Sequence, residues 1–162
     1  CLGMQLTIIE YVKNVIKLKN SGSSEFGKYK NNIISLMTEW KLNNKKVKRS
    51  KENDLGATMR LGAYPCYIKK NSLASKVYRK KIISERHRHR YEVNPKFKSI
   101  IEKGDLIFSG FSKDKKLLEI VENKNHKWFL AVQYHPELKS KPFRPHPIFL
   151  SFIKNSLVHK NV

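Results

Sequence analysis

The first residue of the chain, Cys1, stands where a cysteine side chain can act as a nucleophile. Apolar residues recur at spacings of three and four from residue 2 to residue 16, which predicts an amphipathic helix directly after Cys1. The dipole and free N–H groups at the start of a helix favour a thiolate. Gly3 would leave room where a Cβ would crowd a sharp turn, as in a nucleophile elbow. The C-x-G pattern alone is weak, because an ordinary terminal cysteine explains it equally well.

A histidine and a glutamate near the other end of the chain could complete such a site. His135 and Glu137 follow the strand expected at residues 128–134, and Pro136 lies between them. Residues two positions apart in an extended segment share one side. A carboxylate there can hold an imidazole in the tautomer that accepts a proton from a thiol. A strand-end histidine beside a solvated acid is nevertheless the commoner outcome for this pair.

The elements expected around these residues alternate irregularly along the chain. Polar composition at residues 19–30 and 41–56 predicts exposed loops, and Cys66 is expected to be an ordinary strand residue. The mixture predicts one three-layer α/β domain with a mixed sheet. Strands are expected at residues 33–40, 58–68, 82–93, 106–111, 117–121 and 128–134, and helices at residues 2–16, 73–80, 95–102 and 148–157.

Positive charge is the main bulk feature of the 162 residues. Lys and Arg number 34 against 13 Asp and Glu, which gives a formal net charge of +21 at pH 7. Such a charge suits nucleic acid or another polyanion, but a lysine-enriched surface gives the same total. The sequence lacks an aromatic RNA-binding motif, a zinc spacing and a glycine-rich RNA clamp. The two cysteines form neither a disulfide framework nor a CxxC pair, so we expect a cytoplasmic protein with reduced thiols.

Motifs spread along the chain occur together, and in the same order, in one known family. Residues 1–5 read CLGMQ, residues 58–62 read TMRLG, residues 85–94 read ERHRHRYEVN and residues 133–137 read QYHPE. With them the chain resembles the class I glutamine amidotransferases, and among these the CTP synthases. The resemblance implies a mostly parallel central sheet that is incomplete at its N-terminal side. It also implies that residues 1–162 are the C-terminal part of a glutaminase domain, without the start of that domain and without the synthetase domain.

The resemblance implies a Cys-His-Glu triad. Cys1 would be the nucleophile, His135 the general base and acid, and Glu137 the residue that orients His135. The backbone N–H of Leu2 would be one arm of the oxyanion hole. The family's other arm comes from a glycine-rich loop upstream of the cysteine, so we expect the chain alone to be inactive.

The resemblance also implies a pocket for free glutamine, which carries both a positive and a negative charge. Arg90 would bind the α-carboxylate, Glu25 the α-ammonium group, and Gln5 would face the substrate. In an extended run the arginines of residues 86–90 would share one face and the histidines the other. Arg49 and Arg60 are candidates for coupling to GTP, with surface and core roles as the alternative.

The whole enzyme that the resemblance implies would use ammonia from glutamine for the ATP-dependent amination of UTP to CTP. It would use ATP and Mg²⁺, respond to GTP as an activator and form a homotetramer. No cofactor or metal is expected within residues 1–162, and neither a membrane nor nucleic acid is expected as a partner. Two other functions stay open. One is a basic nucleic-acid-binding module, and the other is an N-terminal-nucleophile amidotransferase that uses the α-amine of Cys1 as its base.

Overall fold

The computed structural model describes residues 1–36, 39–42, 45–48 and 59–160. The α-helices are α1 (Leu2–Asn14), α2 (Leu73–Tyr78), α3 (Lys98–Ile101) and α4 (Pro147–Val158), with 3₁₀ turns at Pro95–Phe97 and Pro136–Lys139. The strands are β1 (Ser21–Ser23), β2 (Asn31–Leu36), β3 (Glu39–Leu42), β4 (Lys45–Lys48), β5 (Arg60–Ile68), β6 (Ile82–His89), β7 (Tyr91–Val93), β8 (Leu106–Phe111), β9 (Leu118–Asn123) and β10 (Leu130–Val132).

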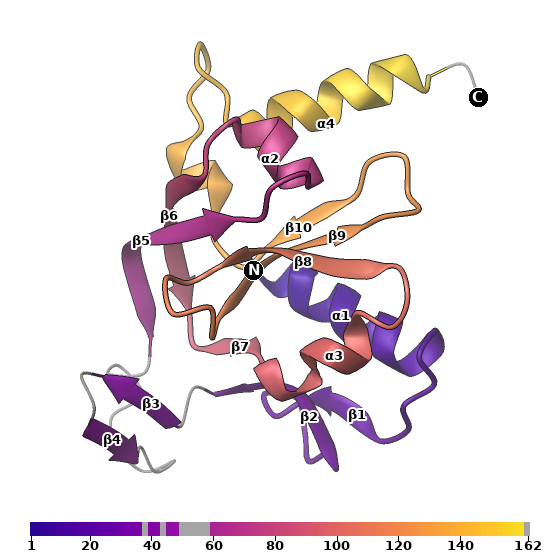
Figure 1. The fold of residues 1–162 in the computed structure, drawn as a ribbon, viewed down its shortest axis with the longest axis vertical. Coiled ribbons are helices and arrows are strands. Elements are labelled where there is room, and N and C mark those ends of the chain that lie inside the picture. Colours follow the sequence, from indigo (N-terminus) through magenta and orange to yellow (C-terminus); the bar gives the residue numbers. More distant parts are fainter. Residues whose placement is uncertain (37–38, 43–44, 49–58, 161–162) are drawn as a thin grey trace.

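Five strands form the central sheet in the order β10-β9-β8-β5-β6 (Figure 1), and each neighbouring pair is antiparallel. A smaller sheet, β1-β2-β7, contains one parallel pair, β1 with β2. Parallel pairing needs a crossover of a dozen or more residues, whereas the turns at 112–117 and 124–129 are short. The described central sheet is therefore antiparallel where we expected mostly parallel pairing, while the α/β class is confirmed.

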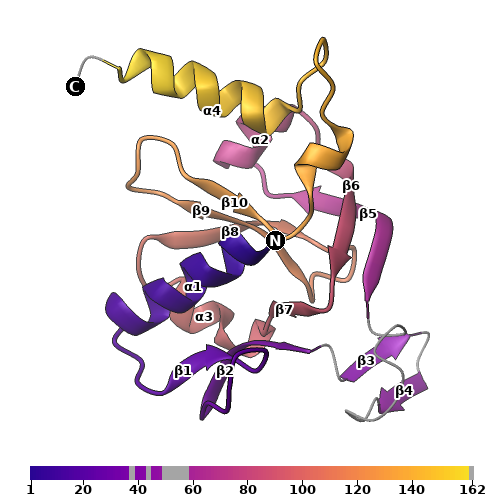
Figure 2. The ribbon, with the colours of Figure 1, turned by 180° about the vertical axis from the view of Figure 1, so that it is seen from behind.

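Helices cover both faces of the five-stranded sheet, which gives the three layers expected from the sequence. Helices α1 and α3 lie on one side, and α2 and α4 lie on the other (Figures 1 and 2). One core cluster joins α1 to β2, β8 and β9, and the other joins β5, α2, β10 and α4 around the fully buried Cys66. Because both faces are covered, β9 is buried from Leu118 to Glu122 instead of alternating.

Two segments expected to be loops contain strands. Residues 19–30 include β1, and residues 41–56 include the end of β3 and all of β4, which pair as a hairpin. The polar composition of these segments does not predict strands. The strands form because their backbones pair with neighbouring strands, more than through an apolar alternation in the sequence. The remainder of the second segment, 43–44 and 49–56, lies outside the described residues.

Helix α1 holds Cys1 at its N-cap position, so the expected helix directly after this residue is confirmed. The helix buries Met4, Ile8 and Val12 on the side that faces the sheet. Gly3 does not have the role we expected among the described residues, because a Cβ added to it meets no atom within 4 Å. Gly3 is solvent-exposed, so crowding by the described part of the chain does not require a glycine there.

Gly110 in β8, in contrast, allows a close contact between strands. A Cβ on Gly110 would lie 2.3 Å from Cγ1 of the fully buried Ile120. We expect Gly110→Ala to lower the unfolding free energy by about 1–3 kcal/mol in chemical denaturation. The matched control, Gly3→Ala, places the same methyl group in open space on a helix. It should leave the unfolding free energy unchanged or raise it by up to about 1 kcal/mol, and equal losses in both variants would contradict the packing argument.

Candidate active site

A pocket of about 340 Å³ lies at the start of α1. It brings together residues that the sequence placed around a glutamine molecule: Cys1, Leu2, Gln5, Glu25 and Arg90. Glu25 is exposed and Arg90 is half-buried, so the two charges border the opening and not the core. A negative and a positive side chain in one pocket match the two charged groups of a free amino acid.

Residues that the sequence had not assigned to substrate also line this pocket. They are Met59, Arg88, His89 and Tyr91. The alternation expected along β6 is confirmed, because His87 and His89 are buried whereas Arg86 and Arg88 are exposed. The wall of the pocket therefore combines the exposed Arg88 and the half-buried Arg90 with the buried imidazole of His89.

Cys1 contacts the end of β10, far away in the sequence. Its α-amino group donates a hydrogen bond to the carbonyl of Val132. The side-chain amide of Gln133 donates to Cys1 Sγ at 3.6 Å. Burial lowers the pKa of the α-amino group to about 6, although the negative charge of Glu137 acts in the opposite direction.

Gln133 is a candidate functional residue that the sequence analysis missed. Its side chain is fully buried, and its Oε1 accepts from Gln5 Nε2 at 3.4 Å. Gln5 Nε2 also donates to the carbonyl of Tyr91 at 2.8 Å, which fixes the Gln5 amide. An N–H donor aimed at sulfur favours the thiolate over the thiol. The sequence signal that could have identified Gln133 is its position, since it is a polar amide between the apolar strand and the His-Pro-Glu motif.

His135 and Glu137 do not line the pocket but follow the strand end that Cys1 contacts. His135 Nδ1 lies 2.6 Å from Glu137 Oε1. Because the carboxylate accepts, Nδ1 carries the hydrogen of a neutral ring and Nε2 keeps the lone pair. Partial burial opposes ionisation of Glu137, but the hydrogen bond from His135 keeps the pKa of that carboxyl below its usual value.

The second ring nitrogen of His135 has the environment that a proton acceptor needs. Among the described residues, Nε2 is buried and has no hydrogen-bond partner. The backbone N–H of His135 donates to the carbonyl of Arg86 at 2.8 Å, which ties the segment to β6. The arrangement matches the expected pair of base and orienting acid, and the roles of Cys1, His135 and Glu137 stay predictions.

Arg60 lies in a buried ion cluster with side chains of β6, β7 and β9. Its guanidinium contacts Glu92 Oε1 at 3.1 Å and Glu119 Oε1 at 2.9 Å. Only 7% of Arg60 is exposed, which matches the core alternative stated for this residue. Its coupling to GTP stays a prediction, and Arg49 lies outside the described residues.

The hydrogen bonds of this cluster fix the histidine tautomers. His89 Nδ1 lies 3.2 Å from the carbonyl of Tyr91, so this nitrogen carries the hydrogen. His89 Nε2 must then accept from His87 Nδ1, 2.8 Å away. His87 Nε2 is left without a hydrogen, 3.7 Å from Glu119 Oε2. Within the described part of the chain, neither of these last two atoms has a hydrogen-bond partner.

Burial shifts the pKa values of this cluster towards the neutral form of each titratable side chain apart from Arg60. Burial, with the Arg60 charge, lowers the pKa of His87 to about 2 and the pKa of His89 to about 3. Burial raises the pKa of Glu92 to about 7 and also raises the pKa of Glu119, although Arg60 opposes both shifts. Both imidazoles are therefore neutral near pH 7, and two carboxyls share one guanidinium.

Comparisons with known proteins show the family of the chain. The family "Glutamine amidotransferase class-I" matches residues 1–155. The CTP synthase of Pelagibacter ubique is 56% identical over 160 residues, which cover 99% of this chain and 30% of that protein. The CTP synthase of Hyphomonas neptunium is 54% identical over 94% of this chain and 28% of that protein. The chain thus spans about 30% of the length of the curated relatives that it matches.

A solved structure is similar as well. It is described as the glutaminase domain of Trypanosoma brucei CTPS with bound acivicin. The sequences are 36% identical, the TM-score is 0.84, and the match covers 96% of this chain and 58% of that chain.

Gln133→Leu should make Cys1 less reactive. Loss of one hydrogen bond of about 1 kcal/mol to the thiolate should slow alkylation by iodoacetamide at pH 7.5 by about fivefold. Mass spectrometry in a Cys66→Ser background assigns the adduct to Cys1, and Gln133 in that background is the reference. An unchanged rate would show that Gln133 does not act on the thiolate.

His89→Gln should make the unfolding free energy depend less steeply on pH below about pH 6. An unfolded histidine binds a proton below about pH 6.5, whereas His89 in the folded chain stays neutral down to about 3, so its contribution is lost as the pH falls. Between pH 6 and pH 4 the unfolding free energy of the unmodified chain should fall by about 1.4 kcal/mol per pH unit more than that of the variant.

The control for this slope is His126→Gln, a change at a solvent-exposed histidine. Glu92 shifts stability in the opposite direction over part of this range, and it is present in all of these proteins. Equal slopes in His89→Gln and the unmodified chain would contradict a buried, neutral His89.

Proposed function

Because this chain belongs to the class I glutamine amidotransferase family, we propose that it is the glutamine-hydrolysing part of a CTP synthase. The observation that carries the proposal is the pocket that joins Cys1 to Glu25 and Arg90. The His135–Glu137 pair beside it supports the same chemistry, because His135 Nε2 is available to accept a proton.

The pocket would hold glutamine by its two charged groups. Arg90 binds the α-carboxylate and Glu25 the α-ammonium group, which directs the side-chain amide towards Cys1. His135 Nε2 takes the thiol proton, and the sulfur attacks the amide carbon. The N–H of Leu2 stabilises the negative oxygen that forms.

The second half of the reaction would regenerate the cysteine. The C–N bond breaks while His135 returns its proton to the departing nitrogen, which leaves as ammonia. His135 then takes a proton from water, whose oxygen attacks the thioester carbon. The C–S bond breaks, glutamate leaves, and the thiol regains its proton. Glu137 stabilises the imidazolium formed in each half.

The relatives extend well beyond the part that this chain matches. That additional part would bind ATP, Mg²⁺ and UTP and provide the second oxyanion donor. The whole enzyme would respond to GTP and assemble as a homotetramer, and we expect it in the cytoplasm. Within the described residues, no helix is long and apolar enough to cross a membrane.

The test is a chimera in which this chain replaces the matching 30% of the Pelagibacter ubique CTP synthase. The chimera should form CTP from UTP with either glutamine or ammonia as the nitrogen source. His135→Ala should lower the glutamine-dependent rate by at least about 10³-fold and leave the ammonia-dependent rate within about twofold. His126→Ala, the same change at an exposed histidine, should leave both rates unchanged.

The chimera also decides between rival mechanisms. The low pKa of the Cys1 α-amine, about 6, is what favours an N-terminal-nucleophile mechanism. In the chimera the nitrogen of Cys1 belongs to a peptide bond, so hydrolysis there cannot use an α-amine. Glutamine-dependent activity that survives His135→Ala would reject the triad, and equal loss of both rates would make His135 structural.

A further inference from the structure

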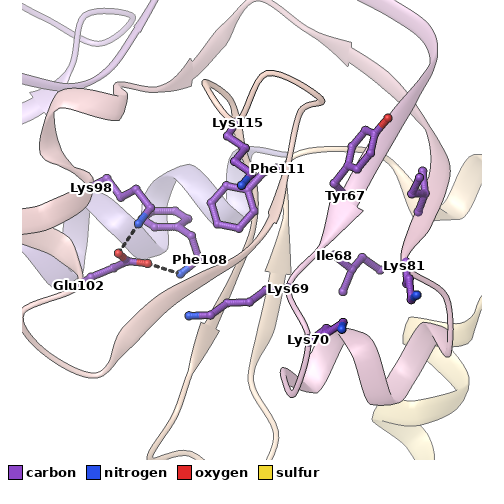
Figure 3. A pocket seen from close by; sticks show the side chains of 11 residues that line it. Tyr67, Ile68, Lys69, Lys70, Lys81, Lys98, Glu102, Phe108, Phe111 and Lys115 are labelled. Atoms are coloured by element: carbon purple, nitrogen blue, oxygen red, sulfur yellow. Dashed lines mark hydrogen bonds and ion pairs between the residues drawn. The ribbon is translucent and has the colours of Figure 1, made fainter.

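A second and larger cavity lies where β5 separates from β8. Among the described residues, the two strands pair only at Tyr67 and Ile68, the last residues of β5, and the preceding part of β5 pairs with β6. The space has a volume of about 650 Å³, within the range of small-molecule sites, and shares no lining residue with the Cys1 pocket. It is lined by Tyr67, Ile68, Lys69, Lys70, Lys81, Ile82, Lys98, Glu102, Phe108, Phe111 and Lys115 (Figure 3).

The wall formed by β8 is apolar and aromatic. Phe108 is fully buried and Phe111 is half-buried, and Ile68 of β5 is also buried. In Figure 3 the two phenylalanines lie between the lysines that border the space. The half-buried ring of Phe111 offers a flat surface for a planar apolar group.

The border of the cavity is basic. Five of its lining residues are lysines, and Glu102 is the carboxylate among them. Glu102 Oε1 accepts from the backbone N–H of Phe108 at 3.0 Å, and Oε2 accepts from Lys98. Glu102 is therefore already engaged with Lys98 and the backbone. The other lysines, Lys69, Lys70, Lys81 and Lys115, have no acidic partner among the described residues.

The fold, and not chance on a lysine-rich surface, brings these four lysines to one cavity. Lys69 follows β5 and is fixed by its N–H bond to the Ser109 carbonyl at 2.8 Å. The carbonyl of Lys81 accepts from the N–H of Ile68 at 2.9 Å, which places Lys81 at the same junction. Lys115 comes from the turn between β8 and β9. Their mutual repulsion over an apolar wall would be relieved by an anion.

We propose that this cavity binds a small organic phosphate with a flat apolar group. The ring lies against the half-buried Phe111, with Phe108 packed behind it in the core, and the phosphate contacts the ammonium groups of Lys69 and Lys115, with Lys70 and Lys81 adding to the positive field. Lysine suits this role because it binds phosphate as a point charge without demanding one geometry. The assignment does not depend on glutamine hydrolysis, because the lining is separate from Cys1.

The experiment uses phenyl phosphate, which joins the two features, beside inorganic phosphate and phenol, which carry one each. Titration calorimetry at 0.15 M salt on the 162-residue chain should give at least about tenfold tighter binding for phenyl phosphate than for either. Amide resonances of the ¹⁵N-labelled chain should shift at Ile68, Lys69 and Phe111. Shifts centred on Arg88 and Arg90 would overturn the assignment.

Matched variants separate the cavity from the general charge of the chain. Lys69→Gln/Lys115→Gln should weaken phenyl phosphate at least about tenfold, whereas Lys127→Gln/Lys154→Gln, exposed and outside the lining, should change it by less than about twofold. Phe111→Leu should bring phenyl phosphate down to the affinity of inorganic phosphate without changing the latter. If the double variant does not fold, Lys69→Gln and Lys115→Gln alone should each weaken binding by about threefold or more.

Each contrary result overturns the proposal. Equal losses in the two double variants would mean long-range charge attraction. Equal affinities for phenyl phosphate and inorganic phosphate would mean that the aromatic wall plays no part. Single-stranded RNA that binds more tightly than phenyl phosphate, and is lost in Lys69→Gln/Lys115→Gln, would make this a nucleic-acid surface instead.

Discussion

The pair of buried contacts between the Arg60 guanidinium and the side chains of Glu92 and Glu119 is the interaction on which the rest of the structure depends. Arg60 begins β5, Glu92 lies in β7 and Glu119 lies in β9, so one guanidinium joins strands of both sheets. Removal of one partner from such a cluster leaves a buried charge unpaired, which is far more costly than loss of a surface ion pair. The β6–β7 segment, which supplies Glu92, also carries Arg88, His89, Arg90 and Tyr91 of the Cys1 pocket.

The second constraint is the contact between the start of α1 and the segment that follows β10. Cys1 precedes α1, whereas Gln133 and His135 follow β10, the strand that α1 contacts. A reacting thiol must be held within a fraction of an ångström of its partners, and buried hydrogen bonds restrict motion better than exposed ones. The contacts from the Tyr91 carbonyl through Gln5 and Gln133 to the sulfur supply that restriction.

Sequence periodicity predicted the elements that face a core, and motifs predicted the pocket. Helix α1, strand β8 and the closing helix follow from apolar spacing, since burial selects it. The antiparallel order of the sheet and strand β1 were missed, because both depend on which backbones meet. The roles of Gln133 and the Lys69–Lys115 cavity were missed for the same reason. The contacts that an amide or a lysine makes depend on residues that are distant in the sequence and close in the fold.

The distribution of acidic residues changes how the net charge should be understood. Glu85, Glu92, Glu119 and Glu122 are buried, although the whole chain has only 13 acidic residues. They act as internal acceptors, and Glu122, for example, receives the N–H groups of Leu73 and Ala74 at the start of α2. Arg60 is the one buried lysine or arginine among the described residues. The surface is therefore more basic than the total of +21 suggests, because the fold withdraws carboxylates from it while leaving the lysines in solvent.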